Sequence, residues 1–192
     1  MRHSEVSRET AETAVKLSLE LDGSGRAEVH TGVGFLDHML TLLALHGGFD
    51  LAVSCKGDLN VDAHHSVEDV GLCLGAAIAQ ALGKKRGINR YGHIILPMDE
   101  ALILCAVDLS GRPCLRYTAQ LPAQKVGDFD TELAQEFFQA LANTALMSLH
   151  IRQLDGVNTH HIIEGMFKAL GRALREAVAV TGGALPSTKG VL

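Results

Sequence analysis

Two histidine pairs, each followed three residues later by a glutamate, form the pattern in this sequence best suited to chemistry. The pattern His-His-x-x-Glu occupies residues 64–68 and recurs at residues 160–164. The two copies are 96 residues apart, half of the 192-residue chain, and several leucine, glycine and alanine positions after each copy also match. We interpret the repetition as an internal duplication.

The ligand types in the repeated pattern point to metal binding. Residues three and four positions apart on a helix share a face, so each glutamate is expected beside its two histidines. Imidazole and carboxylate without thiolate favour manganese, iron or zinc over calcium or magnesium. Adjacent side chains diverge by about 100° around a helix, so a histidine pair suits two ions better than one. The doubled pattern therefore predicts two metals bridged by ligands from both halves.

Two further residues are candidates for the same site. His38 lies in another apolar run with helical spacing, beside Asp37. The equivalent helix of the second half offers Glu136, which fits a metal ligand and a solvated helix face equally well on sequence alone.

A group of cationic and hydroxyl residues can together bind a phosphate. Its members are Arg90, Arg112, Lys168 and the run Ser187–Gly190. Taken singly, each is more typical of a plain surface charge. The sequence contains no glycine-rich nucleotide-binding motif, so a nucleotide cradle is not indicated.

Composition narrows the class of protein. With 47% hydrophobic residues and 20% charged residues, the chain has the make-up of one soluble globular domain. The net charge of −5 disfavours nucleic acid as a main partner. No apolar run is long enough to span a membrane, and the first residues do not resemble a signal peptide. We therefore expect a cytoplasmic protein without a membrane partner.

The elements that must position these residues follow from periodicity. Thr13–Leu21 alternates apolar and polar residues, which predicts a half-buried strand, and the run from Phe35 has helical spacing and stops at Gly47-Gly48. The other predicted strands are 26–31, 49–55, 101–109, 114–119 and 146–154, and the other predicted helices are 64–82, 131–143 and 160–180. Each half then reads β-β-α-β-α. This predicts an α+β fold with two small sheets backed by helices, in which repeats of about residues 1–88 and 89–182 form a single domain with a tail at 183–192.

At this point the sequence resembles the imidazoleglycerol-phosphate dehydratase family of histidine biosynthesis over nearly its whole length. The stretches that carry the resemblance are Arg8–Thr13, Gly34–Met39, Asp62–Asp69, Pro97–Ala101, His160–Glu164 and Pro186–Val191. The paired His-His-x-x-Glu blocks together with the Pro-Ser-Thr-Lys-Gly-Val tail are highly specific to that family.

The resemblance implies a manganese enzyme that removes water from imidazole glycerol phosphate to give imidazole acetol phosphate, with two Mn²⁺ per active site. It implies metal ligands at His38, His64, His65, Glu68, Glu136, His160, His161 and Glu164. Some family members have histidine where this chain has Glu136. Substrate-binding positions fall on Glu12, Arg90, Arg112, Lys168, Ser187 and Lys189. Similar members assemble as twenty-four-chain homo-oligomers with sites between subunits.

The chemistry explains why such residues are needed. The carbon-bound hydrogen to be lost has no carbonyl beside it to acidify it, so an ordinary base alone should fail. Two metals on the ring nitrogens would favour the imidazolate, whose electrons expel the neighbouring hydroxyl through a diazafulvene-like intermediate. Our hypothesis is that Glu12 carries the proton and that the cationic group holds the phosphate. The predicted catalytic residues are Glu12, His38, His65, Glu68, His161 and Glu164.

Two other classes of protein use similar ligands. A di-metal hydrolase or phosphatase would direct a metal-bound hydroxide at its substrate. A non-enzymatic metal-storage shell would carry its ligands on long helices, as ferritin-like bundles do. The alternating strands at Thr13–Leu21 and Ala101–Leu109 argue against the storage shell.

Overall fold

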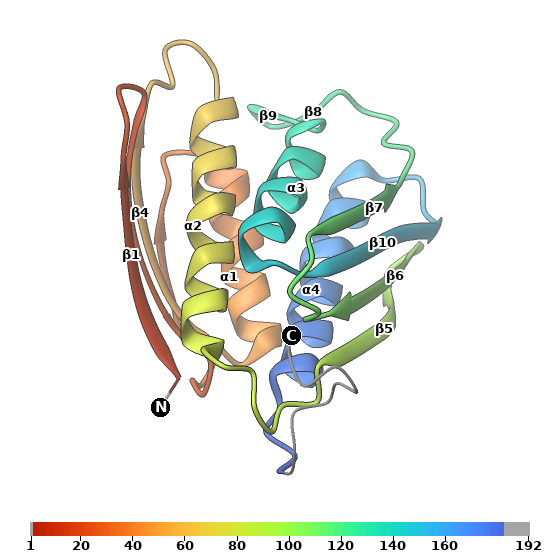
Figure 1. The fold of residues 1–192 in the computed structure, drawn as a ribbon. Coiled ribbons are helices and arrows are strands. Elements are labelled where there is room, and N and C mark those ends of the chain that lie inside the picture. The colour runs from red at the N-terminus through yellow and green to blue at the C-terminus, as the bar shows by residue number, and fades with distance from the viewer. Residues whose placement is uncertain (1, 183–192) are drawn as a thin grey trace.

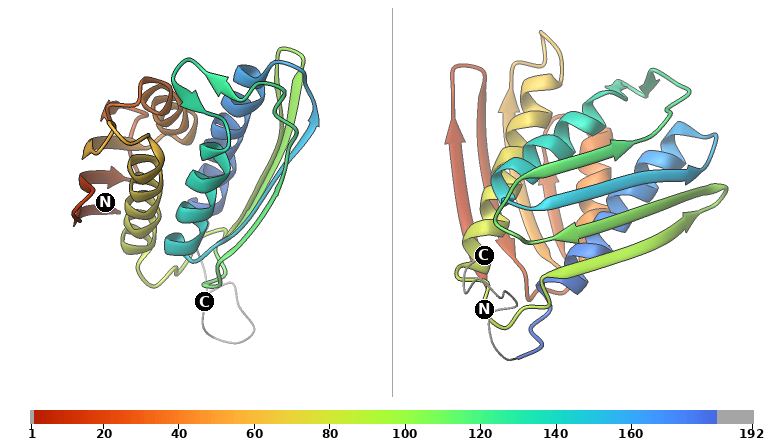
Figure 2. Two further views of the ribbon diagram at one scale, coloured as in Figure 1. Left: turned by 90° about the horizontal axis from the view of Figure 1, so that it is seen from above. Right: turned by 45° about the vertical axis from the view of Figure 1, so that its right-hand side comes forward.

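The computed structural model describes residues 2–182, which fold into four layers in the order sheet, helices, helices, sheet (Figure 1; Figure 2). The first half of the chain supplies one outer sheet and the two helices that cover it. Its strands are β1 His3–Glu9, β2 Thr13–Glu20, β3 Ala27–His30 and β4 Asp50–Gly57, and its helices are α1 Gly34–Gly47 and α2 His64–Leu82.

The second half supplies the other two layers in the same sequence of elements. Its sheet contains β5 Tyr91–Met98, β6 Ala101–Asp108, β7 Cys114–Thr118 and β10 Ser148–Asp155, and its helices are α3 Leu133–Ala145 and α4 Thr159–Val178. A short hairpin of β8 Lys125–Val126 and β9 Phe129–Asp130 precedes α3.

The two sheets share one topology. Their strand orders are β1-β2-β4-β3 and β5-β6-β10-β7. In each sheet the first two pairings are antiparallel and the third is parallel. The α+β class and the doubled arrangement predicted from the sequence are therefore confirmed.

The predicted repeat unit was one strand short, because each half begins with an additional edge strand and reads β-β-β-α-β-α. In β1 only Ser4 is buried, and the other residues are half-buried or exposed. In β5 only Gly92 is buried. Edge strands of this kind carry no clear alternation of apolar and polar residues, so periodicity did not identify them.

The inner faces of the sheets and helices form one continuous core. Strand β2 buries Val15, Leu17 and Leu19 on the side that faces α2. Between α3 and α4, the rings of Phe137 and Phe138 lie 5.0 and 4.8 Å from that of Phe167. Among the described residues, no helix is both long and apolar enough to cross a membrane.

Glycines let the helices of the two halves approach closely. A Cβ on Gly75 would lie 2.4 Å from the carbonyl oxygen of Leu141 on α3, and a Cβ on Gly171 would lie 2.6 Å from that of Leu43 on α1. These two glycines are equivalent in the duplication, so a glycine permits the close approach at both helix crossings. The crossings align the N-terminal ends of the helices, where the predicted ligands lie.

We predict that Gly75→Ala and Gly171→Ala each lower the free energy of unfolding by about 1–3 kcal/mol, because the added methyl group meets backbone that cannot move aside. Gly34→Ala is the matched control, since a Cβ there has open space around it. Thermal or denaturant unfolding of the three variants measures the difference. Equal stability of all three would show that the helix crossings tolerate a methyl group.

Candidate metal and catalytic site

The histidine pairs lie in the first turns of α2 and α4, where side chains fix the helix starts. Asn158 caps α4, and its side-chain oxygen accepts hydrogen bonds from the backbone N–H of His160 at 2.9 Å and of His161 at 3.3 Å. Asp62 accepts from the backbone N–H of His64 at 2.7 Å in the corresponding position before α2. The helix starts therefore hold each histidine pair at a defined place.

One cluster of possible ligands joins the two halves of the chain. His38 extends from α1, and His160 and Glu164 extend from α4. The Oε2 atom of Glu164 lies 3.4 Å from Nε2 of His38 and 3.1 Å from Nε2 of His160. The ligand atoms of the three residues all lie within 4.8 Å of one another, the one such group in residues 2–182. His38 of the first half thus meets two residues of the second-half His-His-x-x-Glu pattern, whereas the first-half copy at residues 64–68 is not part of this group.

Glu164 is the buried charge of this cluster. Only 7% of the residue is exposed. Burial by itself raises the pKa of its carboxyl, but hydrogen bonds from Lys168, His160 and His38 and the charge of Lys168 outweigh burial and leave the pKa below its ordinary value. Lys168 Nζ lies 2.5 Å from Glu164 Oε1. The carboxylate is therefore held ionised beside two imidazoles.

The donor set fits a transition-metal ion. Two imidazole nitrogens and one carboxylate oxygen converge, and no thiolate is among them. This combination suits manganese, iron or zinc. An ion bound there would also neutralise the charge of Glu164, which the protein otherwise balances with Lys168.

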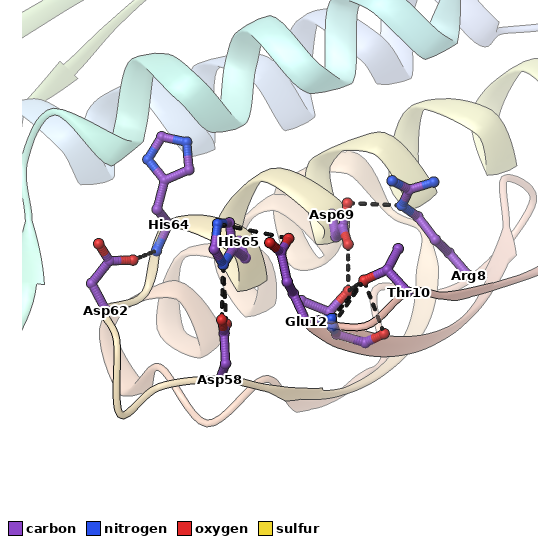
Figure 3. A network of polar contacts seen from close by, with 9 residues as sticks. Arg8, Thr10, Glu12, Asp58, Asp62, His64, His65 and Asp69 are labelled. Carbon is purple, nitrogen blue, oxygen red and sulfur yellow. Dashed lines mark hydrogen bonds and ion pairs between the residues drawn. The ribbon is translucent and has the colours of Figure 1, made fainter.

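The second histidine of each pair turns away to its own carboxylate. His65 Nδ1 lies 3.0 Å from Asp58, and its Nε2 lies 3.7 Å from Oε2 of Glu12 (Figure 3). His161 Nδ1 lies 2.7 Å from Glu100, and its Nε2 lies 3.7 Å from Asp99. A carboxylate on Nδ1 fixes the tautomer and leaves Nε2 as the nitrogen with a lone pair for another partner.

The hydrogen bonds also shift pKa values. The hydrogen bond to Asp58 is the main cause that raises the pKa of His65, and the hydrogen bond to Glu100 does the same for His161. In turn, the His161 hydrogen bond and the backbone N–H of Asn158 lower the pKa of Glu100 to about 2.

A cavity of 760 Å³ opens beside the cluster. His38, His160 and Phe35 line one side, and the β8–β9 hairpin residues 125–130 line another. Acidic residues Asp62, Asp128 and Asp130 also border it. The cavity is large enough for a small-molecule substrate.

The remaining predicted ligands do not form a second compact group. His64 and Glu68 lie on α2, and Glu136 lies on α3; all three are half-buried. The ring centroid of His64 lies 6.1 Å from that of His65. Within the described part of the chain these residues do not converge as the His38 cluster does.

Of the predicted phosphate-binding residues, Lys168 contacts Glu164 of the cluster, whereas Arg90 and Arg112 lie far from it. Arg90 precedes β5 and donates to Asp108 at 2.7 Å, and Arg112 lies in the loop after β6 and donates to the carbonyl of Ser110 at 3.3 Å. Tyr91 pairs with Asp108 at this end of the β5–β6 hairpin, and Met98 pairs with Ala101 at the other end, beside Glu100. Seven residue steps along a strand span about 23 Å. Ser187 and Lys189 lie outside the described residues.

Sequence reasoning did not single out Asp58, Asp99 or Glu100. Asp99 and Glu100 belong to a stretch that carried the family resemblance, but only the hairpin register brings them to His161. Asp58 precedes His65 by seven residues, and the spacing alone gives no sign of their contact.

Comparison with solved structures finds the same fold in two dehydratases. The crystal structure of imidazoleglycerol-phosphate dehydratase from Staphylococcus aureus superimposes with a TM-score of 0.85 at 40% identity, covering 93% of this chain and 99% of that one. The Pyrococcus furiosus structure gives a TM-score of 0.84 at 37% identity, covering 97% and 100%.

Sequence comparison gives the same result. A family model for imidazoleglycerol-phosphate dehydratase matches residues 31–174. The dehydratase of Heliobacterium modesticaldum is 57% identical over the full length of both chains. That of Desulforamulus reducens is 58% identical and covers 100% of this chain and 98% of its own.

Fold, site and relatives together define a hydro-lyase, an enzyme that removes water from its substrate. The chain belongs to the imidazoleglycerol-phosphate dehydratase family, whose reaction is part of histidine biosynthesis. The predicted resemblance is therefore confirmed. The hydrolase and metal-storage alternatives are not supported by these matches.

We predict that Glu100→Gln returns the pKa of His161 toward about 6.5, the value of an unperturbed histidine. Because the folded pKa is raised, the stability from this pair is fully present below the unfolded pKa and is lost as pH rises through the folded pKa. A titration of the imidazole resonances of metal-stripped protein by NMR measures the shift. Asp58→Asn serves as the control, since it should move His65 and leave His161 unchanged.

Proposed function

We propose that this chain dehydrates D-erythro-imidazole glycerol phosphate to imidazole acetol phosphate with two manganese ions in each active site. The cluster of His38, His160 and Glu164 is the observation that carries the proposal. It combines a buried ionised carboxylate with two imidazoles, a donor set that manganese accepts.

The proposed ligands divide into three sets. His38, His160 and Glu164 would hold one ion within a single chain. The duplication suggests a related role for His64, Glu68 and Glu136, because α3 packs against α2 as α1 packs against α4. His65 and His161 keep Nε2 as the ligand nitrogen, since Nδ1 of each meets a carboxylate. Carboxylate oxygen is an acceptable ligand for manganese, so Glu136 can stand where some relatives have histidine.

When bound, the manganese ions supply the Lewis-acid charge that acidifies the substrate's imidazole ring. The electrons of that ring would then expel the neighbouring hydroxyl, which leaves as water, through a diazafulvene-like intermediate. Glu12 moves the carbon-bound proton, for which its exposed carboxylate beside His65 is suited. The enol that results tautomerises to the ketone.

We further propose that each active site contains residues from more than one copy of the chain. Arg90 and Arg112 stand at one end of the β5–β6 hairpin, and His161 meets Glu100 near the other, about 23 Å away. The extended substrate spans only about 10 Å at ordinary bond lengths. If Arg90 and Arg112 hold the phosphate while the histidines hold the ring, they belong to different subunits.

This requirement fits a closed homo-oligomer, and the family resemblance suggests a twenty-four-chain shell. Lys168, which contacts Glu164, would orient the substrate from the side of the metal ions. Ser187 and Lys189 of the tail would complete the set of residues that binds the phosphate. A cytoplasmic location stays a prediction from the sequence.

Chelation followed by metal addition tests the cofactor. We predict that metal-stripped protein forms no ketone from imidazole glycerol phosphate and that added manganese restores turnover. His38→Ala should lower manganese-supported turnover by at least about 100-fold, because one ligand of the cluster is lost. His93→Ala, on an exposed strand position, is the control. Unchanged turnover by His38→Ala, or full activity after verified metal removal, would refute the proposal.

Subunit mixing tests the shared site. We predict that Arg90→Ala and His38→Ala are each inactive alone and that dissociated, remixed oligomers regain activity. A 1:1 mixture should restore about one quarter of wild-type sites if each site draws these residues from two chains. A mixture as inactive as its parents, with hybrid assembly verified by mass, would show that one chain supplies both residues.

A further inference from the structure

Asp69 is a buried acidic residue on α2 that directly follows the proposed ligand Glu68 yet faces the β1–β2 hairpin. Only 6% of Asp69 is exposed. One carboxylate oxygen accepts a hydrogen bond from Arg8 Nε at 2.8 Å (Figure 3), and the other accepts one from the Thr13 hydroxyl. Arg8 lies on β1 and Thr13 begins β2, so Asp69 joins both strands of the hairpin to the helix.

The turn between these two strands carries Glu12. The side chain of Thr10, in the same turn, stabilises it. The Thr10 hydroxyl accepts hydrogen bonds from the backbone N–H of Glu12 at 3.1 Å and of Thr13 at 3.0 Å, and the N–H of Thr10 donates to the carbonyl of Thr13 at 2.9 Å. The turn is therefore well defined internally. The position of the turn relative to His65 depends on the contacts that hold the hairpin against α2. Asp69 makes such a contact with each of the two strands.

The second half of the chain fastens its equivalent hairpin differently. There the turn residue Glu100 accepts hydrogen bonds from the backbone N–H of Val157 at 3.2 Å and of Asn158 at 2.8 Å, as well as contacting His161. The position equivalent to Asp69 is Gly165. One carboxylate at the hairpin tip thus both fastens the hairpin and holds the histidine.

In the first half these two tasks belong to other residues. Asp69 fastens the hairpin, and Asp58 holds His65 through Nδ1. The carboxylate of Glu12 keeps 54% of its side chain exposed and approaches His65 Nε2 only at 3.7 Å, longer than a hydrogen bond. This division leaves Glu12 available to a substrate.

We propose that Asp69 is a positioning residue that sets the place of the Glu12 carboxylate relative to the histidines of α2. The inference rests on the proposed role of Glu12 in proton transfer. Asp69 directs its carboxylate to Arg8 and Thr13, and it acts by holding the hairpin from both strands. A displacement of about 1 Å at a reacting group can cost about 100-fold in rate, so this fastening has a direct effect on turnover.

Asp69→Asn tests the proposal with little change of shape. The amide carries no charge, so the charge-assisted pair with Arg8 is lost, and its NH₂ group can meet the Thr13 hydroxyl only if that hydroxyl accepts instead of donating. We expect kcat to fall by about 10- to 100-fold, with KM within about threefold and with manganese content and oligomer size unchanged. A parallel loss of manganese would overturn the proposal, because Asp69 would then act through the ligands.

Asp22→Asn is the matched control. It removes an Arg–Asp pair from the open end of the same hairpin, where Arg2 and Asp22 meet at 2.5 Å. Its kcat should stay within about twofold of wild type, because it is remote from the turn. An equal loss of turnover in Asp22→Asn would show that any weakening of the hairpin lowers activity and would overturn a specific role for Asp69.

The decisive experiment combines Asp69→Asn with Glu12→Gln. If Asp69 acts through Glu12, the double variant is no slower than Glu12→Gln beyond about twofold, because the group being positioned is already disabled. Multiplicative losses would overturn the positioning role. Full turnover by Glu12→Gln alone would refute proton transfer by Glu12, whereas a slow Glu12→Gln beside a fully active Asp69→Asn would refute only the positioning role.

Thr13→Val is a second route if Asp69→Asn does not fold. It deletes the hydroxyl that donates to Asp69 and keeps the Arg8 pair and the buried shape of the side chain. We expect the same selective loss of kcat and the same lack of further effect in the Glu12→Gln background. Turnover equal to wild type would count against the proposal.

Discussion

The buried carboxylate of Glu164 is the constraint on which the rest of the site depends. An ionised group with only 7% exposure is costly unless it is paired and hydrogen-bonded. Here Lys168 and His160 come from the same helix, but His38 comes from α1, so the cluster is complete only when the two halves of the chain are packed together. Formation of the interface between the halves and formation of the cluster are therefore one event.

The duplication explains how the same elements produce two different sites. Equivalent glycines on α2 and α4 set equivalent helix crossings, and equivalent histidine pairs begin both helices. Two of the differences lie at single positions: Glu136 against His38, and Asp69 against Gly165. The first substitution changes the donor atom, and the second changes which residue fastens the neighbouring hairpin. In the β5–β6 hairpin the carboxylate of Glu100 is therefore fully hydrogen-bonded. In the β1–β2 hairpin the carboxylate of Glu12 is available to a substrate.

Much of the fold and of the candidate site could be predicted from the sequence because the patterns that indicate them are local. The histidine pairs lie on helices whose spacing is readable in sequence, and β2 and β6 alternate because one of their faces is buried. Edge strands β1 and β5 lacked that signal. The contacts of His65 with Asp58 and of His161 with Glu100 depend on loop paths and hairpin register, which no spacing rule specifies. The distance of Arg90 from the cluster likewise became visible only once the register was known.

Anomalous diffraction at the manganese edge, from crystals of the manganese-loaded oligomer, tests the central claim most directly. The account predicts a peak within bonding distance of His38, His160 and Glu164, with a second peak that includes His64, Glu68 or Glu136 among its ligands. It also predicts that a neighbouring chain contributes a residue to the same active site. Peaks confined to other residues, or a fully loaded protein with no manganese at the His38 cluster, would contradict it.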